Sequence, residues 1–407
     1  SWLRLIDPSA PSPLSALLLD VHGAHDHLTG VASDPALVGI RASGADVVVD
    51  LDRPGSDFPS IVSSPSFAVV PAQDCPSTSL TLGICDVGSG PYRLGGATST
   101  EITLLANDRY WAGRPAIGTV HLVTDIGGRS PVAAFEAGDL DYAEIAANDA
   151  SWIRYDPTLG PQLRAVPTLE LTYLGFDTSR APFNDVKVRR AFGAAVDWAR
   201  IVALGADGGQ VPADSMVPPG VPGGGDASWL PVHDPAAARQ LLAEAGYPGG
   251  AGFPDVAFGT GGGAFAEGIA ADLKRELGIT IRLEEYSDHF QRLAQDPPGM
   301  WTLGWIADYP GANDFLGVLL GSDSADDYGR WSSPPFDRAL DDALATRDPA
   351  LAKAAFERAL AIVQTDVPVV PLAYSKVWAL ARTGLLGAGQ NGLGIPRLAG
   401  LAWAATP

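Results

Sequence analysis

Residues 254–283, PDVAFGTGGGAFAEGIAADLKRELGITIRL, contain the pattern that decides the fold class. Residues 254–258 and 279–283 have the length and the apolar, partly β-branched character of strands. Between them, a glycine-rich loop leads into residues 266–277, whose apolar positions recur at helical spacing. Because a helical crossover joins strands that run in parallel, this stretch predicts a parallel α/β unit.

Similar signals occur on both sides of this unit. Helices are predicted to begin at Asn184 or Asp185, at Asp234 and at Asp348, because Asp and Asn cap helices, and a proline follows each of the last two. A further helix is predicted at 336–344, strands at 47–51 and 66–70, and extended chain at 367–372. The chain therefore reads as an α/β protein without internal repeats.

Size and charge narrow the function. The 407 residues predict two or three lobes rather than one core. Lys and Arg number 27 against 47 Asp and Glu, a net charge of −20, which repels phosphate backbones and argues against a nucleic-acid partner. No apolar run approaches the roughly 20 residues of a membrane-spanning helix. The first residues do not resemble a signal peptide, although one could have been removed.

The two cysteines, Cys75 and Cys85, lie ten positions apart in a segment rich in Pro, Ser, Thr and Gly. This spacing predicts a disulfide, which persists only in an oxidising compartment. The alternative is a pair of unrelated buried thiols.

Two motifs could indicate other chemistry. The loop at 259–264 with Glu284 and Glu285 downstream has the parts of a dinucleotide site, but a turn of this kind also uses glycine for steric reasons alone. His22, His25 and His27 offer imidazole ligands for a transition metal, although a solvated turn is the simpler interpretation. No hydrolase motif is present, so nothing in the sequence marks a catalyst.

Aromatic residues and a carboxylate meet at residues 301–310, WTLGWIADYP. The alternation predicts a strand that ends in a turn, with Asp308 near its carboxyl end and Trp305 beside it. Such a carboxylate can hold a ligand amine, and an indole face can contact it. The alternative is a core tryptophan and an Asp that only forms the turn.

With these residues the chain resembles a known family, the extracellular solute-binding proteins of the oligopeptide, dipeptide and nickel class (family 5) of ABC importers. Five stretches carry the resemblance in order, and the fourth is the most specific: 87–94, 107–111, 135–143, 173–197 and 304–310. The resemblance implies a two-lobed, clamp-like α/β fold of the periplasmic-binding-protein type with an extra subdomain. The expected parts are an extra subdomain at 1–86, a first lobe at 87–171 with 375–407, and a second lobe at 172–374.

The resemblance also implies a ligand site that closes between lobes and uses no cofactor. In peptide-binding relatives, the carboxylate at the position of Asp308 pairs with the ligand amine. The residues expected to bind ligand are Asp308, Trp305, Gly304, Ile306, Tyr309 and Tyr374. Relatives carry an N-terminal stretch before the point matched by Ser1, so the first lobe is expected to lack part of its front.

The function expected from the resemblance is an extracytoplasmic receptor, periplasmic or at the cell surface, that captures a small peptide or similar amine-bearing solute for a membrane permease. It would be a monomer and not an enzyme, with a possible lipid anchor on a removed N-terminus. The alternatives left open are a nickel or metal-chelate receptor that uses the three histidines, a sensor domain that transports nothing, and a dinucleotide-dependent enzyme.

Overall fold

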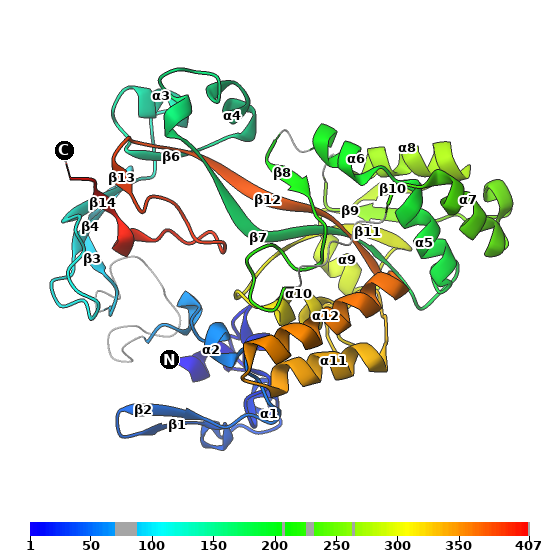
Figure 1. Cartoon of the computed structure of the whole chain (residues 1–407). Coiled ribbons are helices and arrows are strands. Elements are labelled where there is room, and N and C mark those ends of the chain that lie inside the picture. Colours follow the sequence, from blue (N-terminus) through cyan, green and yellow to red (C-terminus); the bar gives the residue numbers. More distant parts are fainter. Residues whose placement is uncertain (70–87, 206–207, 225–231, 263–264, 406–407) are drawn as a thin grey trace. The chain divides into compact units, whose positions relative to one another are not determined.

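The computed structural model describes residues 1–69, 88–205, 208–224, 232–262 and 265–405. The chain divides into two compact units (Figure 1). The first unit holds Ser1–Val166 and Trp378–Pro407, and the second holds Pro167–Val377. The chain passes between them within strands β7 (Leu163–Phe176) and β12 (Val369–Ala381). The expected lobe boundaries after residues 171 and 374 fall within these same two strands, and the three-part division at 86, 171 and 374 stays a prediction.

The second unit is built on a mixed sheet. Its strands follow the order β10 (Arg282–Glu285), β9 (Ala257–Thr260), β11 (Met300–Ile306), β7 and β12, and β8 (Gln210–Pro212) also pairs with β12. Strand β9 is parallel to both β10 and β11, whereas β11 is antiparallel to β7. The parallel pair of β9 and β10, joined through helix α8 (Phe265–Leu277), confirms the α/β unit predicted from residues 254–283.

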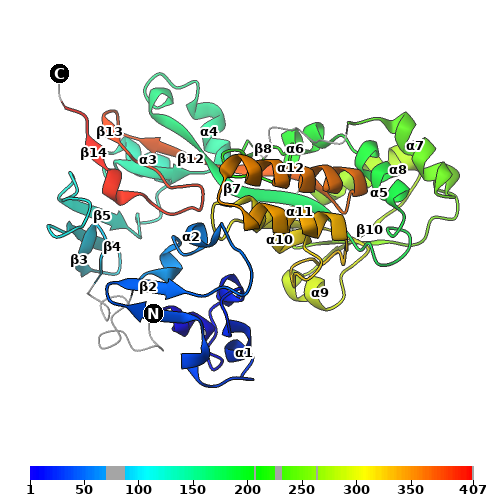
Figure 2. The same cartoon turned by 60° about the horizontal axis from the view of Figure 1, so that its bottom comes forward.

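Helices form two groups in this unit (Figures 1 and 2). One group contains α5 (Val186–Ala195), α6 (Trp198–Gly205), α7 (Pro235–Glu244) and α8, and the other contains α10 (Ala312–Leu320), α11 (Pro334–Ala345) and α12 (Pro349–Asp366). The short helix α9 (His289–Gln295) follows β10. The predicted caps are confirmed, since the side chains of Asp185, Asp234 and Asp348 accept hydrogen bonds from backbone N–H groups of the first turns.

Aromatic rings connect β7 to the first helix group. Phe183 lies between Phe176 and Phe192, with ring centroids 4.9 and 5.2 Å apart, and Phe253 stacks on Phe192 at 5.6 Å. Phe176, Phe183 and Phe192 are almost fully buried. Burial of such large apolar surfaces makes this cluster a main source of stability for the second unit.

The first unit contains a hydrophobic cluster formed by the N-terminal residues. It is built from short 3₁₀ turns (Trp2–Ile6, Ser15–Leu18 and Pro35–Leu37), helices α1 (Ala24–Leu28) and α2 (Phe58–Ile61), and the hairpin of β1 (Ile40–Ser43) and β2 (Asp46–Val49). Strand β2 confirms the strand predicted at 47–51, with its end two residues earlier.

The strand predicted at 66–70 is wrong for the residues that are described there. Pro65–Phe67 form a 3₁₀ turn instead. Ser64 with Pro65 starts this turn, and Phe67 is buried against Trp2, whose Nε1 donates to the carbonyl of Phe67 at 2.8 Å. The local conformation of these residues is therefore set by the packing of Phe67 on Trp2 and not by their strand propensity.

The rest of the first unit has two further parts. An antiparallel meander contains β3 (Tyr92–Ala97), β4 (Glu101–Ala106) and β5 (Thr119–Val123). Helices α3 (Pro131–Glu136) and α4 (Ala147–Ile153) pack with β6 (Tyr142–Ile145), which pairs with the end of β12. A small ladder of β13 (Leu385–Leu386) and β14 (Ala402–Trp403) and two 3₁₀ turns (Gly160–Gln162 and Leu398–Gly400) complete this unit.

Two sequence features concern compartment rather than fold. Cys75 and Cys85, the predicted disulfide pair, lie outside the described residues. Among the residues that are described, none of the helices has the length and apolar character needed to cross a bilayer.

Candidate functional site

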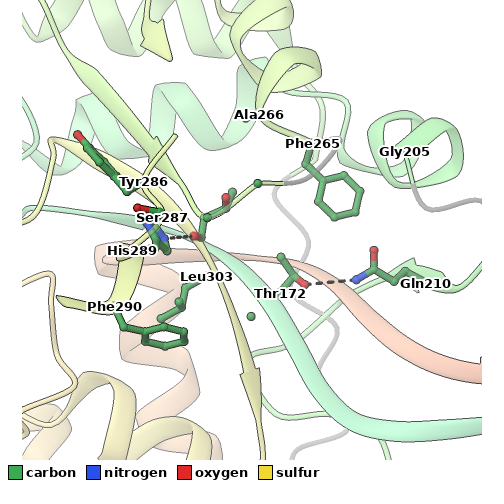
Figure 3. Close-up of a pocket in the computed structure, with 14 residues that line it drawn as sticks. Thr172, Gly205, Gln210, Phe265, Ala266, Tyr286, Ser287, His289, Phe290 and Leu303 are labelled. Carbon is green, nitrogen blue, oxygen red and sulfur yellow. Dashed lines mark hydrogen bonds between the residues drawn. The ribbon is translucent and has the colours of Figure 1, made fainter. Parts of the chain in front are cut away.

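A pocket of about 550 Å³ lies within the second unit, beside strand β11 (Figure 3). In Figure 3, Tyr286, His289 and Phe290 lie together on one side of the pocket, and Phe265 lies with Gln210 on the other. Its lining residues are Thr172, Gly205, Gln210, Gly261, Gly262, Phe265, Ala266, Tyr286, Ser287, His289, Phe290, Thr302, Leu303 and Gly304. Mixed aromatic and polar linings of this kind are typical of ligand sites.

Strand β11 presents a free edge to this pocket. Strand β9 pairs only with Met300 and Trp301, so residues 302–306 have no strand on that side among the described residues. The N–H of Ala307, just after β11, donates to the carbonyl of Leu169 in β7 at 2.9 Å. Because backbone groups alternate along an antiparallel strand, those of Gly304 and Ile306 face away from β7, toward the free edge.

His289 confirms this alternation independently. Its Nε2 lies 2.9 Å from the carbonyl oxygen of Thr302, which can only accept, so Nε2 carries the proton. The ring is stacked on Tyr286 at 6.3 Å and is 8% exposed. Burial lowers the pKa of His289 below its ordinary value, although the bond to Thr302 opposes this shift. The imidazole is therefore a neutral wall of the pocket that fixes Thr302.

Gln210, which lines the pocket, is hydrogen bonded to polar side chains of two other strands. The side-chain amide of Gln210 on β8 donates to Oγ of Ser375 at 3.2 Å and, more weakly, to the hydroxyl of Thr172 at 3.4 Å (Figure 3). These contacts join β8, β7 and β12, so Gln210 has its position set by three strands.

Asp308 follows the carboxyl end of β11 by two residues, as predicted. Its backbone N–H donates to Oδ2 of Asp314 at 3.2 Å, and Trp305 donates from Nε1 to the same oxygen at 3.0 Å. Asp314, fully buried at the start of α10, thus holds the turn that presents Asp308. No ion pair or hydrogen bond to the Asp308 carboxylate occurs among the described residues. Partial burial, and next the charge of Asp326, raise its pKa.

Asp327 is a further acidic side chain of the second unit whose pKa is shifted. Burial raises the pKa of Asp327 to about 7, although the backbone N–H groups of Trp331, Gly329 and Arg330 oppose the shift. The neighbouring Asp326 accepts the hydroxyl of Tyr328 through Oδ1 at 2.9 Å.

Asp327 predicts a pH-dependent stability. Its folded pKa of about 7 is above the ordinary value of 3.8, so its contribution to the free energy of unfolding is greatest in acid and is lost as pH rises from about 4 to about 7. We expect the Asp327→Asn variant to lose part of the decrease in melting temperature that the parent shows between about pH 5 and pH 8. Thermal unfolding at the two pH values measures this, and an unchanged decrease would contradict the role of Asp327.

The structure locates the other residues expected to bind ligand. Gly304 lines the pocket, Ile306 is 61% exposed and Trp305 is partly buried. Tyr309 is buried in the core, where its hydroxyl accepts from the side-chain amide of Asn313. Tyr374 is also buried, and its hydroxyl bonds the backbone N–H and carbonyl of Ser215. Contacts of these six residues with a ligand remain predictions.

Among the described residues, the three histidines do not come together as a metal site. His22 contacts Asp52 through Nδ1 at 2.6 Å, whereas His27 is buried with Nδ1 near the carbonyl of Ala32. His25 lies 3.7 Å from Asp26. No group of three or more potential metal ligands occurs in the described part of the chain. His22 lies in a turn, as predicted, whereas His25 and His27 lie in the short helix α1, which begins after Gly23 in the left-handed conformation.

The glycine loop has a steric explanation. A Cβ at Gly259 would lie 2.6 Å from Cγ of Pro298 and 3.0 Å from the Tyr286 ring, so only glycine fits. Glu284, one of the two carboxylates required by the dinucleotide interpretation, accepts the Tyr286 hydroxyl and pairs with Arg282. The loop instead forms part of the pocket wall through Gly261 and Gly262.

Several pocket residues were missed by sequence reasoning. Tyr286 and Ser287 follow β10, and the carboxyl ends of parallel strands are where α/β proteins place ligands, so this signal was available. Gln210 and Thr172 carry no such signal, because they meet only through strand pairing.

Comparison with known proteins agrees with this architecture. The model of the bacterial extracellular solute-binding proteins, family 5 (middle) matches residues 1–327. Heme-binding protein A of Haemophilus influenzae is 29% identical over 72% of this chain and 56% of its own length, less than two thirds. The periplasmic oligopeptide-binding protein OppA of Salmonella typhimurium is 27% identical over 92% of this chain and 72% of its own.

A solved structure shows the same fold. The unliganded open form of the periplasmic murein tripeptide-binding protein MppA superposes with a TM-score of 0.81 at 22% identity, and the alignment covers 98% of this chain and 79% of that one. This likeness confirms the predicted two-lobed α/β fold class, and the family match covers most of the sequence. The chain belongs to the bacterial extracellular solute-binding proteins of family 5.

Proposed function

We propose that this protein binds a small peptide, or a similar amine-bearing solute, and delivers it to the permease of an ABC importer. The Asp308 carboxylate is the observation that carries the proposal. It is partly buried, has no cationic partner among the described residues and has a raised pKa. A cation placed beside such a carboxylate stabilises its ionised form, and an α-amine also donates charge-assisted hydrogen bonds.

The free edge of β11 supports a peptide rather than a simple amine. Gly304 and Ile306 direct backbone N–H and carbonyl groups to the side of the strand that β9 leaves unpaired. An extended peptide can add to such an edge through main-chain hydrogen bonds, which are independent of its side chains. Asp308, two residues beyond the strand, is then placed to receive one end of the ligand.

Relatives bind ligands of different classes by name, heme in one case and oligopeptides in another. The combination of a strand edge and a carboxylate matches the main chain and α-amine of a peptide. We further propose an extracytoplasmic location with a possible lipid anchor, no catalytic activity, and a monomeric state. We also propose a disulfide between Cys75 and Cys85, because an extracytoplasmic compartment is oxidising enough to preserve it.

A comparison of free and N-acetylated forms of one peptide tests the proposal. Native mass spectrometry of the purified protein would first identify a retained ligand or suitable tripeptides. Calorimetry is expected to show binding of the free peptide and a loss of about 30-fold or more on acetylation, because the carboxylate is then buried without a cation. Equal affinities would contradict the role of the amine. Nickel binding in the absence of peptide binding would favour the metal alternative, and a regulator gene in place of a permease gene beside this one would favour the sensor.

A further inference from the structure

The pocket beside β11 is notable for the charge of its walls. Among the described residues that line it, none is Lys, Arg, Asp or Glu. The polar side chains are hydroxyls, one amide and one imidazole, from Thr172, Thr302, Tyr286, Ser287, Gln210 and His289. Aromatic surface comes from Phe265 and Phe290. The lining residues that the structure describes can therefore hydrogen bond to a ligand but offer no counter-charge to it.

Charged groups near the pocket are held by one another. Arg292 lies over the Tyr286 ring at 5.7 Å and pairs with Asp296 at 2.9 Å. Glu284 accepts the hydroxyl of Tyr286 and pairs with Arg282. Glu285 is exposed, and one of its carboxylate oxygens lies 3.4 Å from where a Cβ of Gly262 would be. Of these five described charges, Glu285 pairs with none of the others, and its charge is negative.

His289 does not supply a cation either. Its Nε2 is already used by the Thr302 carbonyl, and its buried Nδ1 has no hydrogen-bond partner among the described residues. Protonation of the ring would create a buried N–H without an acceptor, which is costly. Burial accordingly lowers the pKa of His289.

From these contacts we propose that the pocket is a specificity pocket for an uncharged ligand side chain, aromatic or amide, and that Gln210 stands where a cation would be needed to admit a carboxylate. This inference rests on the proposed function and adds the class of side chain that the ligand carries. A carboxylate that entered would lose water without gaining a cation, and burial of an unpaired charge costs far more than burial of a hydrogen-bonded amide.

The test uses pairs of tripeptides that differ only by Gln or Glu at one position, taken at each of the three positions in turn. At one position, the parent protein is expected to bind the Gln peptide at least about 10-fold more tightly than the Glu peptide. Measurements in about 0.5 M salt remove the long-range repulsion of a protein with many carboxylates, because the Debye length is then only a few ångström.

The Gln210→Lys variant is expected to invert this preference at the same position, because its ammonium then faces the carboxylate in the pocket. Gln364→Lys is the matched control, because Gln364 is exposed on α12 and its substitution changes the net charge of the protein by the same amount. The control should keep the parent preference.

Each outcome has a distinct meaning. If no tripeptide binds, the proposed function fails. If peptides bind but Gln and Glu are equal at every position in the parent protein, the pocket proposal fails even if the Gln210 variant does not fold. A shift in preference that is the same for both lysine variants would also overturn the role of Gln210.

Discussion

The Asp308→Asn variant is expected to lose binding of a free-amine peptide almost completely, by about 2–5 kcal/mol, or some 30-fold to several thousand-fold in affinity. Asn has nearly the shape of Asp, so the turn held by Asp314 should persist. The variant loses only the charge that we propose to face the amine. Titration calorimetry of the parent and variant with the same peptide measures the effect.

The stability of this variant provides the control. Burial and Asp326 raise the folded pKa of Asp308, so the ionised carboxylate weakens the folded state at neutral pH. The melting temperature of Asp308→Asn without ligand should therefore be equal to or above that of the parent protein. Binding by the parent should weaken as pH falls through the raised pKa, since a protonated carboxyl no longer attracts the amine.

Asp323→Asn, at an exposed position between α10 and α11, is a matched substitution that should leave affinity unchanged. A retained affinity in Asp308→Asn, or an equal loss in the Asp323 variant, would show that Asp308 is not the amine contact.

The Arg189→Ala variant is expected to destabilise the second unit by about 3 kcal/mol or more. Arg189 is 5% exposed on α5, and its guanidinium donates to the carbonyls of Phe183 at 2.6 Å and Val367 at 2.9 Å, and also to that of Asp366. Burial lowers the pKa of Arg189 to about 10, so it stays charged at neutral pH. Removal of the side chain leaves three carbonyls without their donor and opens a cavity.

The neighbouring residue is a natural control for this prediction. Arg190 is half-buried, and its hydrogen bonds within the described part of the chain go to the carbonyl of Thr365 alone, so Arg190→Ala should cost much less. Urea denaturation of the parent and both variants compares the free energies of unfolding. Similar values for the two variants would mean that the contacts of Arg189 do not stabilise the unit.

Local sequence patterns predicted some elements of this fold and missed others, and the difference lies in how far apart the interacting residues are. The caps at Asp185, Asp234 and Asp348, and the strand–helix–strand unit at 254–283, depend on residues close in sequence, so patterns predicted them. The strand predicted at 66–70 is wrong because the conformation there depends on the packing of Phe67 on Trp2, 65 residues away. Arg189 lay in a matched family stretch, but its role depends on carbonyls more than 170 residues away.

By itself, the sequence determined the α/β class, the starts of several helices, the family and the position of Asp308 beyond the end of a strand, because each depends on short-range patterns or an ordered set of motifs. Tertiary structure alone decided that Gln210 faces the hydroxyls of Thr172 and Ser375, and that Gly304 lies on an unpaired strand edge. Strand order and register bring these residues together, and such long-range pairing leaves no periodic mark in the sequence.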